Sequence, residues 1–302
     1  MLVGATFVAA ELIGAAARVS VQRQRAAAQP GEEHMVDKLT TVDPQVLLHR
    51  VADLLHLPLW HEAKALAQRA EIKTHPLWTA APLDAREQPL LLIGGLCSTA
   101  QLLAPLHDLM VKLNFRCRLA PTRLGLGCGE DIVQRSEDAL ERLVEAAGQP
   151  AIIIGHSRGG QIGRVLAARR PDLTRGLITL GSPLTRLLGV NPWLFAQLSV
   201  IAMAGSLRVP GLLSASCGWG SCCARLRTDL TGTFPVHVPF TSIYSRSDRI
   251  VDWRTCLDPA ARHREVDSAH GALTWSPRSL VALVDELTDM LPQRNEQALI
   301  AS

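Results

Sequence analysis

The chain has 302 residues, 47% of them hydrophobic, and its 31 lysine and arginine residues nearly balance 28 aspartate and glutamate residues. This length and apolar content are ample for a large buried core. The net charge of +3 and the aromatic content of 4% argue against a nucleic-acid binder, which usually gathers basic residues and stacks bases on aromatic side chains.

Residues 1–88 are expected to form an N-terminal helical extension. Residues 1–17, MLVGATFVAAELIGAAA, are apolar apart from Glu11. A secretory signal carries its positive charge ahead of the apolar stretch, whereas here Arg18 follows it. A membrane span needs about 20 uninterrupted apolar residues, and this stretch is shorter and contains the carboxylate of Glu11. We therefore expect an Ala-rich helix that packs on the protein body or lies on a membrane surface, in a cytoplasmic protein.

A linker and a second helix complete this extension. Residues 18–33 are polar and contain a Pro-Gly pair, which is typical of a linker. Asp43 and Pro44 then supply an N-cap and a first helical residue, and an apolar stripe continues the helix as far as Pro58.

From residue 89 onward, strand and helix patterns alternate, which makes 89–302 the main domain. Apolar runs predict strands at 89–95, 151–155, 176–183 and 238–245, and shorter strand candidates lie at 115–120 and 263–268. Helical patterns cover 99–113, 130–147, 158–169 and 276–291. Strands that are apolar throughout, alternating with helices, predict an α/β fold with a mostly parallel sheet covered on both faces. Residues 183–237 interrupt this rhythm and are expected to form a helical insertion, a lid or cap, between two strands.

The sequence Gly155-His156-Ser157-Arg158-Gly159 follows a predicted strand directly and opens a predicted helix. In this context the Gly-x-Ser-x-Gly pattern indicates a nucleophile elbow, in which a tight turn holds the serine hydroxyl above the sheet. Glycine-rich turns also cradle phosphates, but the chain has neither a Walker A nor a dinucleotide-binding pattern. We therefore assign Ser157 as a candidate nucleophile.

A serine nucleophile needs a base and a carboxylate that orients it. In elbow-containing folds the acid and then the histidine follow the serine in the chain, each on a loop after a later strand. Asp248 comes directly after the strand at 238–245, with Asp252 as the runner-up, and His270 follows the strand at 263–268. His156 sits beside the nucleophile, so its side chain is expected to point into the packing.

Two backbone N–H groups are expected to form an oxyanion hole. One is that of Arg158, the residue after the nucleophile. The other is assigned to Leu96, because the glycines at 94–95, which follow the first strand, would let the backbone approach a substrate closely. A plain strand-ending turn is the alternative for this loop.

Seven cysteines are too few for a disulfide scaffold in a chain of this length, and no Cys-x-x-Cys pair indicates a zinc site. Cys217 would close a small disulfide loop with Cys222 or Cys223 in an oxidising compartment. Free and mostly buried thiols are the alternative. The sequence predicts no metal ion and no cofactor.

With the elbow at 155–159, Asp248 and His270 in this order, residues 89–292 resemble the α/β-hydrolase superfamily, particularly its lipase- and esterase-like members. GHSRGG, TLGSP at 179–183 and YSRSDRIVDW at 244–253 are similar to a lipase-like group of actinobacterial type. The resemblance implies a Ser-His-Asp triad, a β-sheet core and a lid inserted between two late strands.

The residues and the resemblance together predict a serine hydrolase that cleaves carboxylic esters. The apolar insertion favours a hydrophobic acyl chain, and a cap that packs on the core with no substrate role is the alternative. Its partners would be a small ester or lipid substrate and, through the N-terminal helix, a membrane surface. An acyltransferase or thioesterase with the same triad stays open, as does a catalytically silent α/β-hydrolase fold that binds protein or lipid.

Overall fold

The structure, a computed structural model, describes residues 75–80 and 82–291. The chain divides into two compact units, Met1–Leu54 and Leu55–Ser302, and all described residues belong to the second. The expected N-terminal helices and the linker at 18–33 lie outside the described residues and stay predictions.

The core of the second unit is a six-stranded sheet in the order β2-β1-β3-β4-β5-β6, in which every pairing is parallel. This confirms the α/β fold class and the parallel sheet expected from the sequence. The strands are β1 (Pro89–Ile93), β2 (Arg116–Leu119), β3 (Ala151–His156), β4 (Thr174–Leu180), β5 (Phe240–Tyr244) and β6 (Arg262–Glu265).

Strand β1 and residues 151–155 of β3 carry no polar side chains because both faces of these strands are buried. In β1, Leu90 and Leu92 pack into one core, and Leu91 and Ile93 pack into a second core on the other face. This follows from the two-residue period of side chains along a strand. The edge strand β6 is exposed at all four positions, and it carries charged side chains instead.

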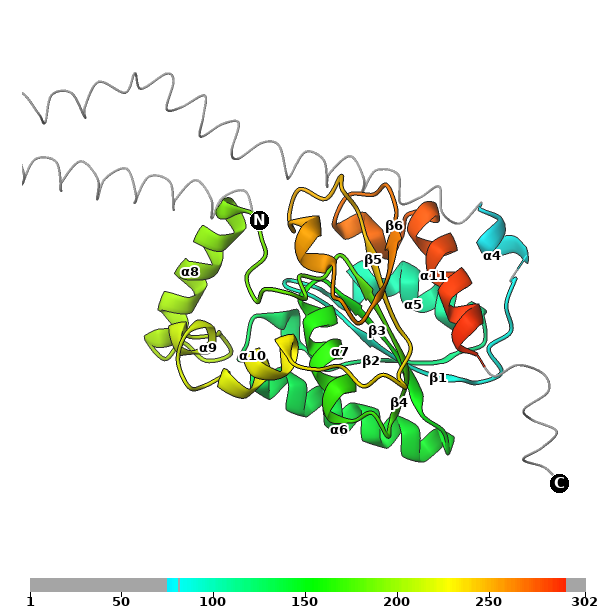
Figure 1. Cartoon of the computed structure of the whole chain (residues 1–302), viewed down its shortest axis with the longest axis horizontal. Helices are drawn as coiled ribbons and strands as arrows, with labels where there is room; N and C mark the ends of the chain where they lie inside the picture. Colours follow the sequence, from blue (N-terminus) through cyan, green and yellow to red (C-terminus); the bar gives the residue numbers. More distant parts are fainter. Residues whose placement is uncertain (1–74, 81, 292–302) are drawn as a thin grey trace, which may run out of the picture. The chain divides into compact units, whose positions relative to one another are not determined.

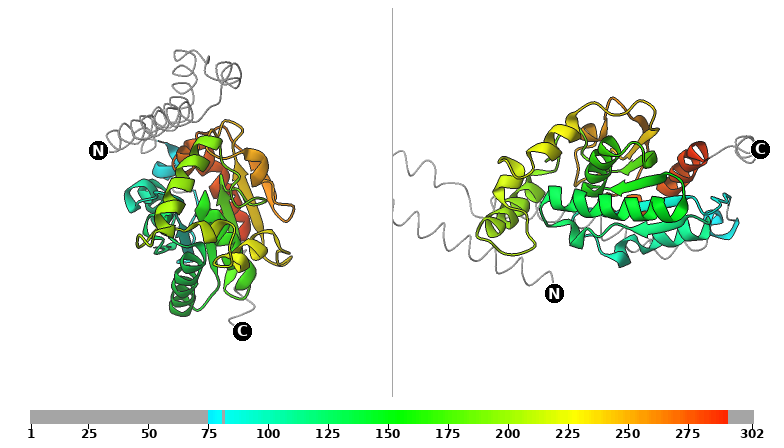
Figure 2. Two further views of the ribbon diagram at one scale, coloured as in Figure 1. Left: turned by 90° about the vertical axis from the view of Figure 1, so that its left-hand side faces the viewer. Right: turned by 90° about the horizontal axis from the view of Figure 1, so that it is seen from below.

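Helices cover both faces of the sheet (Figures 1 and 2). One core contains side chains from α5 (Ala100–Lys112) and α11 (Pro277–Met290), and the other contains side chains from α6 (Gly129–Ala147) and α7 (Arg158–Arg169). Outside the insertion between β4 and β5, the remaining elements are four short helices: α4 (Pro76–Ala80), η2 (Arg123–Gly125), η3 (Trp253–Cys256) and η4 (Gly271–Thr274).

Local sequence signals fix where several helices begin and end. The side chains of Thr99 and Ser276 accept hydrogen bonds from backbone N–H groups in the first turns of α5 and α11. Helix α6 ends at Gly148, which adopts a left-handed conformation with φ +68°. These are the N-caps and the C-terminal glycine that stop helices at defined residues.

Residues 183–237 lie between β4 and β5 and contain three helices, which Figure 1 shows grouped beside the sheet. They are α8 (Pro192–Ser206), α9 (Ala215–Gly218) and α10 (Ala224–Thr231). Among the residues that the structure describes, no helix combines the length and the apolar character needed to cross a bilayer.

A buried ion pair ties α7 to the loop after η3. Arg164 Nε lies 2.5 Å from Asp258 Oδ2, and each side chain is only 4% exposed. The other guanidinium nitrogens donate to the carbonyls of Asp229 and Gly232, each at 2.8 Å. Because every nitrogen of the charged group has a partner, its burial is tolerated, and the pair joins three segments that are distant in sequence.

Replacing Asp258 by alanine should lower the free energy of unfolding by about 3–5 kcal/mol, because the buried Arg164 charge loses its counterion. Urea unfolding followed by circular dichroism measures this change. The control is Arg278→Ala, which removes a surface pair with Asp267 and should cost less than about 1 kcal/mol. Similar losses in the two variants would contradict the importance assigned to the buried pair.

Candidate active site

Ser157 sits at the sharp turn between β3 and α7, where the sequence predicts the elbow. Its backbone has φ +54° and ψ −125°, a strained conformation for a residue with a side chain. A Cβ on Gly155 would lie 2.5 Å from the carbonyl oxygen of Gly159, and a Cβ on Gly159 would collide with the carbonyl of Ile93. The turn therefore closes only with glycine on both sides of the serine.

Asp248 and His270 meet next to this turn, although 22 residues separate them. Asp248 follows β5, His270 precedes η4, and the distance from Asp248 Oδ2 to His270 Nδ1 is 2.6 Å. The other carboxylate oxygen, Oδ1, accepts hydrogen bonds from the N–H groups of Ile250 and Val251 at 2.8 and 2.9 Å. The Asp248 side chain is 2% exposed, so its orientation is fixed by the protein.

Asp252 occupies a different position. Its side chain is 50% exposed and accepts a hydrogen bond from the Arg254 N–H, which caps η3. The structure thus brings Asp248 to His270 and places the runner-up carboxylate at the start of a short helix.

His156 lies beneath the turn, buried as the sequence predicts. Its Nε2 is 3.1 Å from the carbonyl oxygen of His270, and the two rings are 4.9 Å apart between centroids. Burial and, to a smaller extent, the nearby His270 lower the pKa of His156 to about 3. The neutral ring must donate its Nε2 proton to the carbonyl, so His156 holds the backbone that carries His270.

Leu96 and Arg158 both line the cavity that contains Ser157. In the loop before Leu96, a Cβ on Gly95 would lie 2.8 Å from the Ser157 Cβ, so this loop runs directly against the turn. Within residues 82–291, the Leu96 N–H donates no hydrogen bond, and the Arg158 N–H is at the first position of α7, where no carbonyl precedes it in the helix.

The Arg158 side chain is held by backbone carbonyl groups of a neighbouring loop. Its guanidinium donates hydrogen bonds to the carbonyl oxygens of Gly125 and Gly127, the second at 2.9 Å. Arg158 therefore links the turn to the loop at 123–128, in addition to presenting its backbone N–H.

Sequence reasoning did not identify Gly181, which follows β4 with φ +55°. A Cβ at this position would lie 3.3 Å from both Asp248 Oδ2 and His270 Nδ1, and much closer to Leu273. Gly181 thus leaves room for the aspartate–histidine hydrogen bond. The one signal in the sequence was the position of this glycine directly after a buried strand. The side chains that it must make room for, Asp248 and His270, come from loops much later in the chain.

An apolar cavity opens beside Ser157, and its empty space together with the adjoining open solvent amounts to about 920 Å³. Most of its wall comes from the insertion between β4 and β5, and only a few polar groups face it. The apolar lining residues of the insertion include Leu187, Val190, Leu194, Leu198, Ala202 and Leu213.

Replacing His156 by glutamine should flatten the dependence of stability on pH. In the unfolded chain His156 takes up a proton below the ordinary histidine pKa of 6.5, whereas the folded pKa is about 3, so acidification favours the unfolded chain. From about pH 6.5 to about pH 5, the wild type should lose about 1.5 kcal/mol more unfolding free energy than His156→Gln. Urea unfolding at several pH values measures this difference. Because Asp248 and His270 are present in both proteins, unfolding free energies that fall equally with pH in the two would contradict the lowered pKa of His156.

The comparisons with known proteins concern the fold. A scan against protein-family models finds no match, and a search of curated proteins finds none either. Among solved structures, one from work on the metagenome-derived lipolytic enzymes LipS and LipT matches with a TM-score of 0.51 and 14% identity over 69% of this chain and 95% of that chain. A soluble variant of the monoglyceride lipase from Saccharomyces cerevisiae matches with a TM-score of 0.50 and 14% identity over 70% of this chain and 90% of that one. With its parallel six-stranded sheet flanked by helices, the chain has the α/β-hydrolase fold.

Proposed function

We propose that this chain is a serine hydrolase that cleaves carboxylic esters, with Ser157 as nucleophile, His270 as base and Asp248 as the carboxylate that orients the base. The observation that carries the proposal is the buried 2.6 Å hydrogen bond from His270 Nδ1 to Asp248, next to a serine on a strained turn that opens into an apolar cavity. The similar lipases support the same reaction class at the level of the fold.

The hydrogen bond to Asp248 determines which role each ring nitrogen of His270 has in the proposed reaction. With the proton on Nδ1 held by Asp248, Nε2 is the nitrogen that takes the Ser157 hydroxyl proton while Oγ attacks the ester carbonyl. The protonated imidazole then gives this proton to the departing alcohol. Water attacks the acyl-enzyme by the same route, which releases the acid and restores Ser157.

The N–H groups of Leu96 and Arg158 would stabilise the negative charge that develops on the carbonyl oxygen. Both residues line the cavity that contains Ser157, and neither N–H is used within the described loop and helix. Each such donor contributes about 3–4 kcal/mol to the transition state in comparable sites.

The insertion favours a hydrophobic acyl group. Helix α8 has apolar side chains on both its buried and its exposed side: Leu194 and Leu198 face the cavity, while Val200 and Met203 are 64% and 67% exposed. Its C-cap, Leu207, is 82% exposed. A helix that is apolar on both its buried and its exposed face is suited to contact with lipid-like molecules. The motifs shared with lipase-like hydrolases of actinobacterial type point in the same direction.

A fluorophosphonate probe should label the wild-type chain and fail to label Ser157→Ala. Asp248→Asn should lower kcat/KM for a p-nitrophenyl ester by about 10⁴-fold, because the imidazole loses its favoured tautomer. Asp252→Asn is the matched control, since this exposed carboxylate caps η3 and should leave the rate nearly unchanged.

Two results would overturn the proposal. A folded wild-type chain that neither reacts with the probe nor hydrolyses esters would indicate a silent binding fold. A loss confined to Asp252→Asn would exclude Asp248 as the orienting acid. Probe labelling together with preferential transfer to an alcohol or cleavage of a thioester would instead identify an acyltransferase or thioesterase.

A series of p-nitrophenyl esters from acetyl to palmitoyl tests the acyl preference. The value of kcat/KM should rise by about fourfold per buried methylene until the cavity is filled. Leu198→Ala, which shortens a side chain of the cavity wall, should weaken the preference for long chains. Val200→Ala, on the exposed side of the same helix, should leave it unchanged. A preference for acetyl esters in the wild type would contradict the hydrophobic substrate class.

A further inference from the structure

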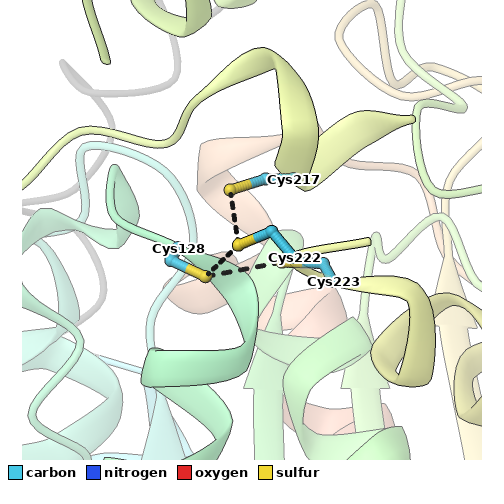
Figure 3. Close-up of side chains that lie close together, drawn as sticks. All are labelled: Cys128, Cys217, Cys222 and Cys223. Atoms are coloured by element: carbon cyan, nitrogen blue, oxygen red, sulfur yellow. Dashed lines mark hydrogen bonds between the residues drawn. The ribbon is translucent and has the colours of Figure 1, made fainter. Parts of the chain in front are cut away.

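Four cysteines from three separate segments converge at one edge of the insertion (Figure 3). Cys128 is the residue before α6, Cys217 belongs to α9, and Cys222 and Cys223 directly precede α10. All four Sγ atoms lie within 4.8 Å of one another. We call these residues the four-cysteine cluster. The catalytic proposal makes no use of it.

The spacing of the sulfur atoms matches a single tetrahedral metal ion. Zinc–sulfur bonds of about 2.3 Å place the sulfurs of a tetrahedral site about 3.8 Å apart. In the cluster, Cys128 Sγ is 3.4 Å from Cys222 Sγ and 3.5 Å from Cys223 Sγ, and Cys217 Sγ is 3.7 Å from Cys222 Sγ. An iron–sulfur cluster would bind its cysteines to different iron atoms and spread the sulfurs further apart.

A positively charged side chain lies beside the cluster. A Cβ on Gly129 would lie 3.5 Å from Arg158 Nη2 and 3.7 Å from Cys223 Sγ, so the guanidinium and this sulfur approach the same point at the start of α6. The Arg158 guanidinium is close enough to interact with Cys223, Cys217 and Cys128. Thiolates are the form of cysteine that binds metal, and a disulfide would gain nothing from this positive environment.

We propose that the four-cysteine cluster binds one Zn²⁺ ion as a structural tetrathiolate site. Four protein sulfurs complete the tetrahedron and leave no position for water or substrate, as in closed structural zinc sites. Soft thiolate ligands in this geometry select zinc or iron among the common divalent metals. Binding requires four thiolates, so the cysteines that are thiols in the metal-free chain release their protons to solvent.

The ion would fasten the insertion to the sheet domain at the cavity wall. Cys128 starts a helix that covers the sheet, whereas the other three ligands belong to the insertion, and Cys128 and Cys222 are 94 residues apart in the chain. Cys217 and Cys223 also line the cavity that contains Ser157. The zinc ion would therefore hold one side of this cavity in place without taking part in the reaction.

Zinc content of the full chain tests the proposal directly. The protein is purified with reductant, without chelator and with any histidine tag removed, and its metals are measured by plasma mass spectrometry. We expect one equivalent of zinc per chain in the wild type and loss of most of it in Cys128→Ser and Cys217→Ser. Cys97→Ser, which changes an exposed cysteine outside the cluster, should retain the zinc.

A second measurement uses the wild-type chain, so that the test does not depend on whether the cysteine variants fold. Wild-type protein stripped of metal under reducing conditions and loaded with Co²⁺ should show the intense visible absorption of a tetrahedral cobalt tetrathiolate, and added Zn²⁺ should remove it. Ser157→Ala should bind zinc like the wild type, so failure of the catalytic proposal would leave this result intact. Metal-free wild type with no cobalt spectrum, iron as the bound metal, zinc retained by Cys128→Ser, or disulfides among the four cysteines in unreduced protein would each overturn the proposal.

Discussion

The structure depends most on the close approach of backbone segments at the turn between β3 and α7. Here the end of β1, the turn and the first residues of α7 pass so near one another that a Cβ on Gly155 or Gly159 would overlap a carbonyl group. This contact forces Ser157 into a positive φ and fixes its place at the end of the central strands. The strain at Ser157 persists because β3 is paired on both sides and α7 is buried along most of its length.

The surrounding groups are held to this turn from distant parts of the chain. His156 reaches down to the carbonyl of His270, and Gly181 leaves space for the hydrogen bond between His270 and Asp248. On the other side, Arg158 binds the carbonyls of the 123–128 loop. Each of these contacts is a hydrogen bond or a close approach between groups from different parts of the chain, so the positions of the residues around Ser157 depend on one another and not only on the local loops.

The insertion between β4 and β5 has a different character. It supplies most of the apolar cavity wall, yet α8 also exposes Val200 and Met203. Hydrogen bonds fasten the insertion to the rest of the fold at several points, such as those from the Asn191 N–H to the Ile250 carbonyl and from the Leu213 N–H to the Leu126 carbonyl. Near its C-terminal end, Leu226, Leu230 and Phe234 pack into the core, and the Arg164 guanidinium binds the carbonyls of Asp229 and Gly232. A metal ion in the four-cysteine cluster would add a further anchor between the insertion and α6.

The sequence by itself determined the features that depend on near neighbours in the chain. The apolar runs of β1, β3 and β4 could be recognised because strands buried on both faces have no polar side, and the elbow could be recognised because its glycines flank the serine within five residues. The positions of Asp248 and His270 after late strands were also open to prediction, since parallel strands end at one edge of the sheet. Only the tertiary structure decided the contact of Gly181 with the aspartate–histidine pair, the bond from His156 to the His270 carbonyl and the meeting of Cys128 with three cysteines about ninety residues later. These contacts join segments whose separation in the chain carries no periodic signal, so they exist only once the sheet has placed its loops side by side.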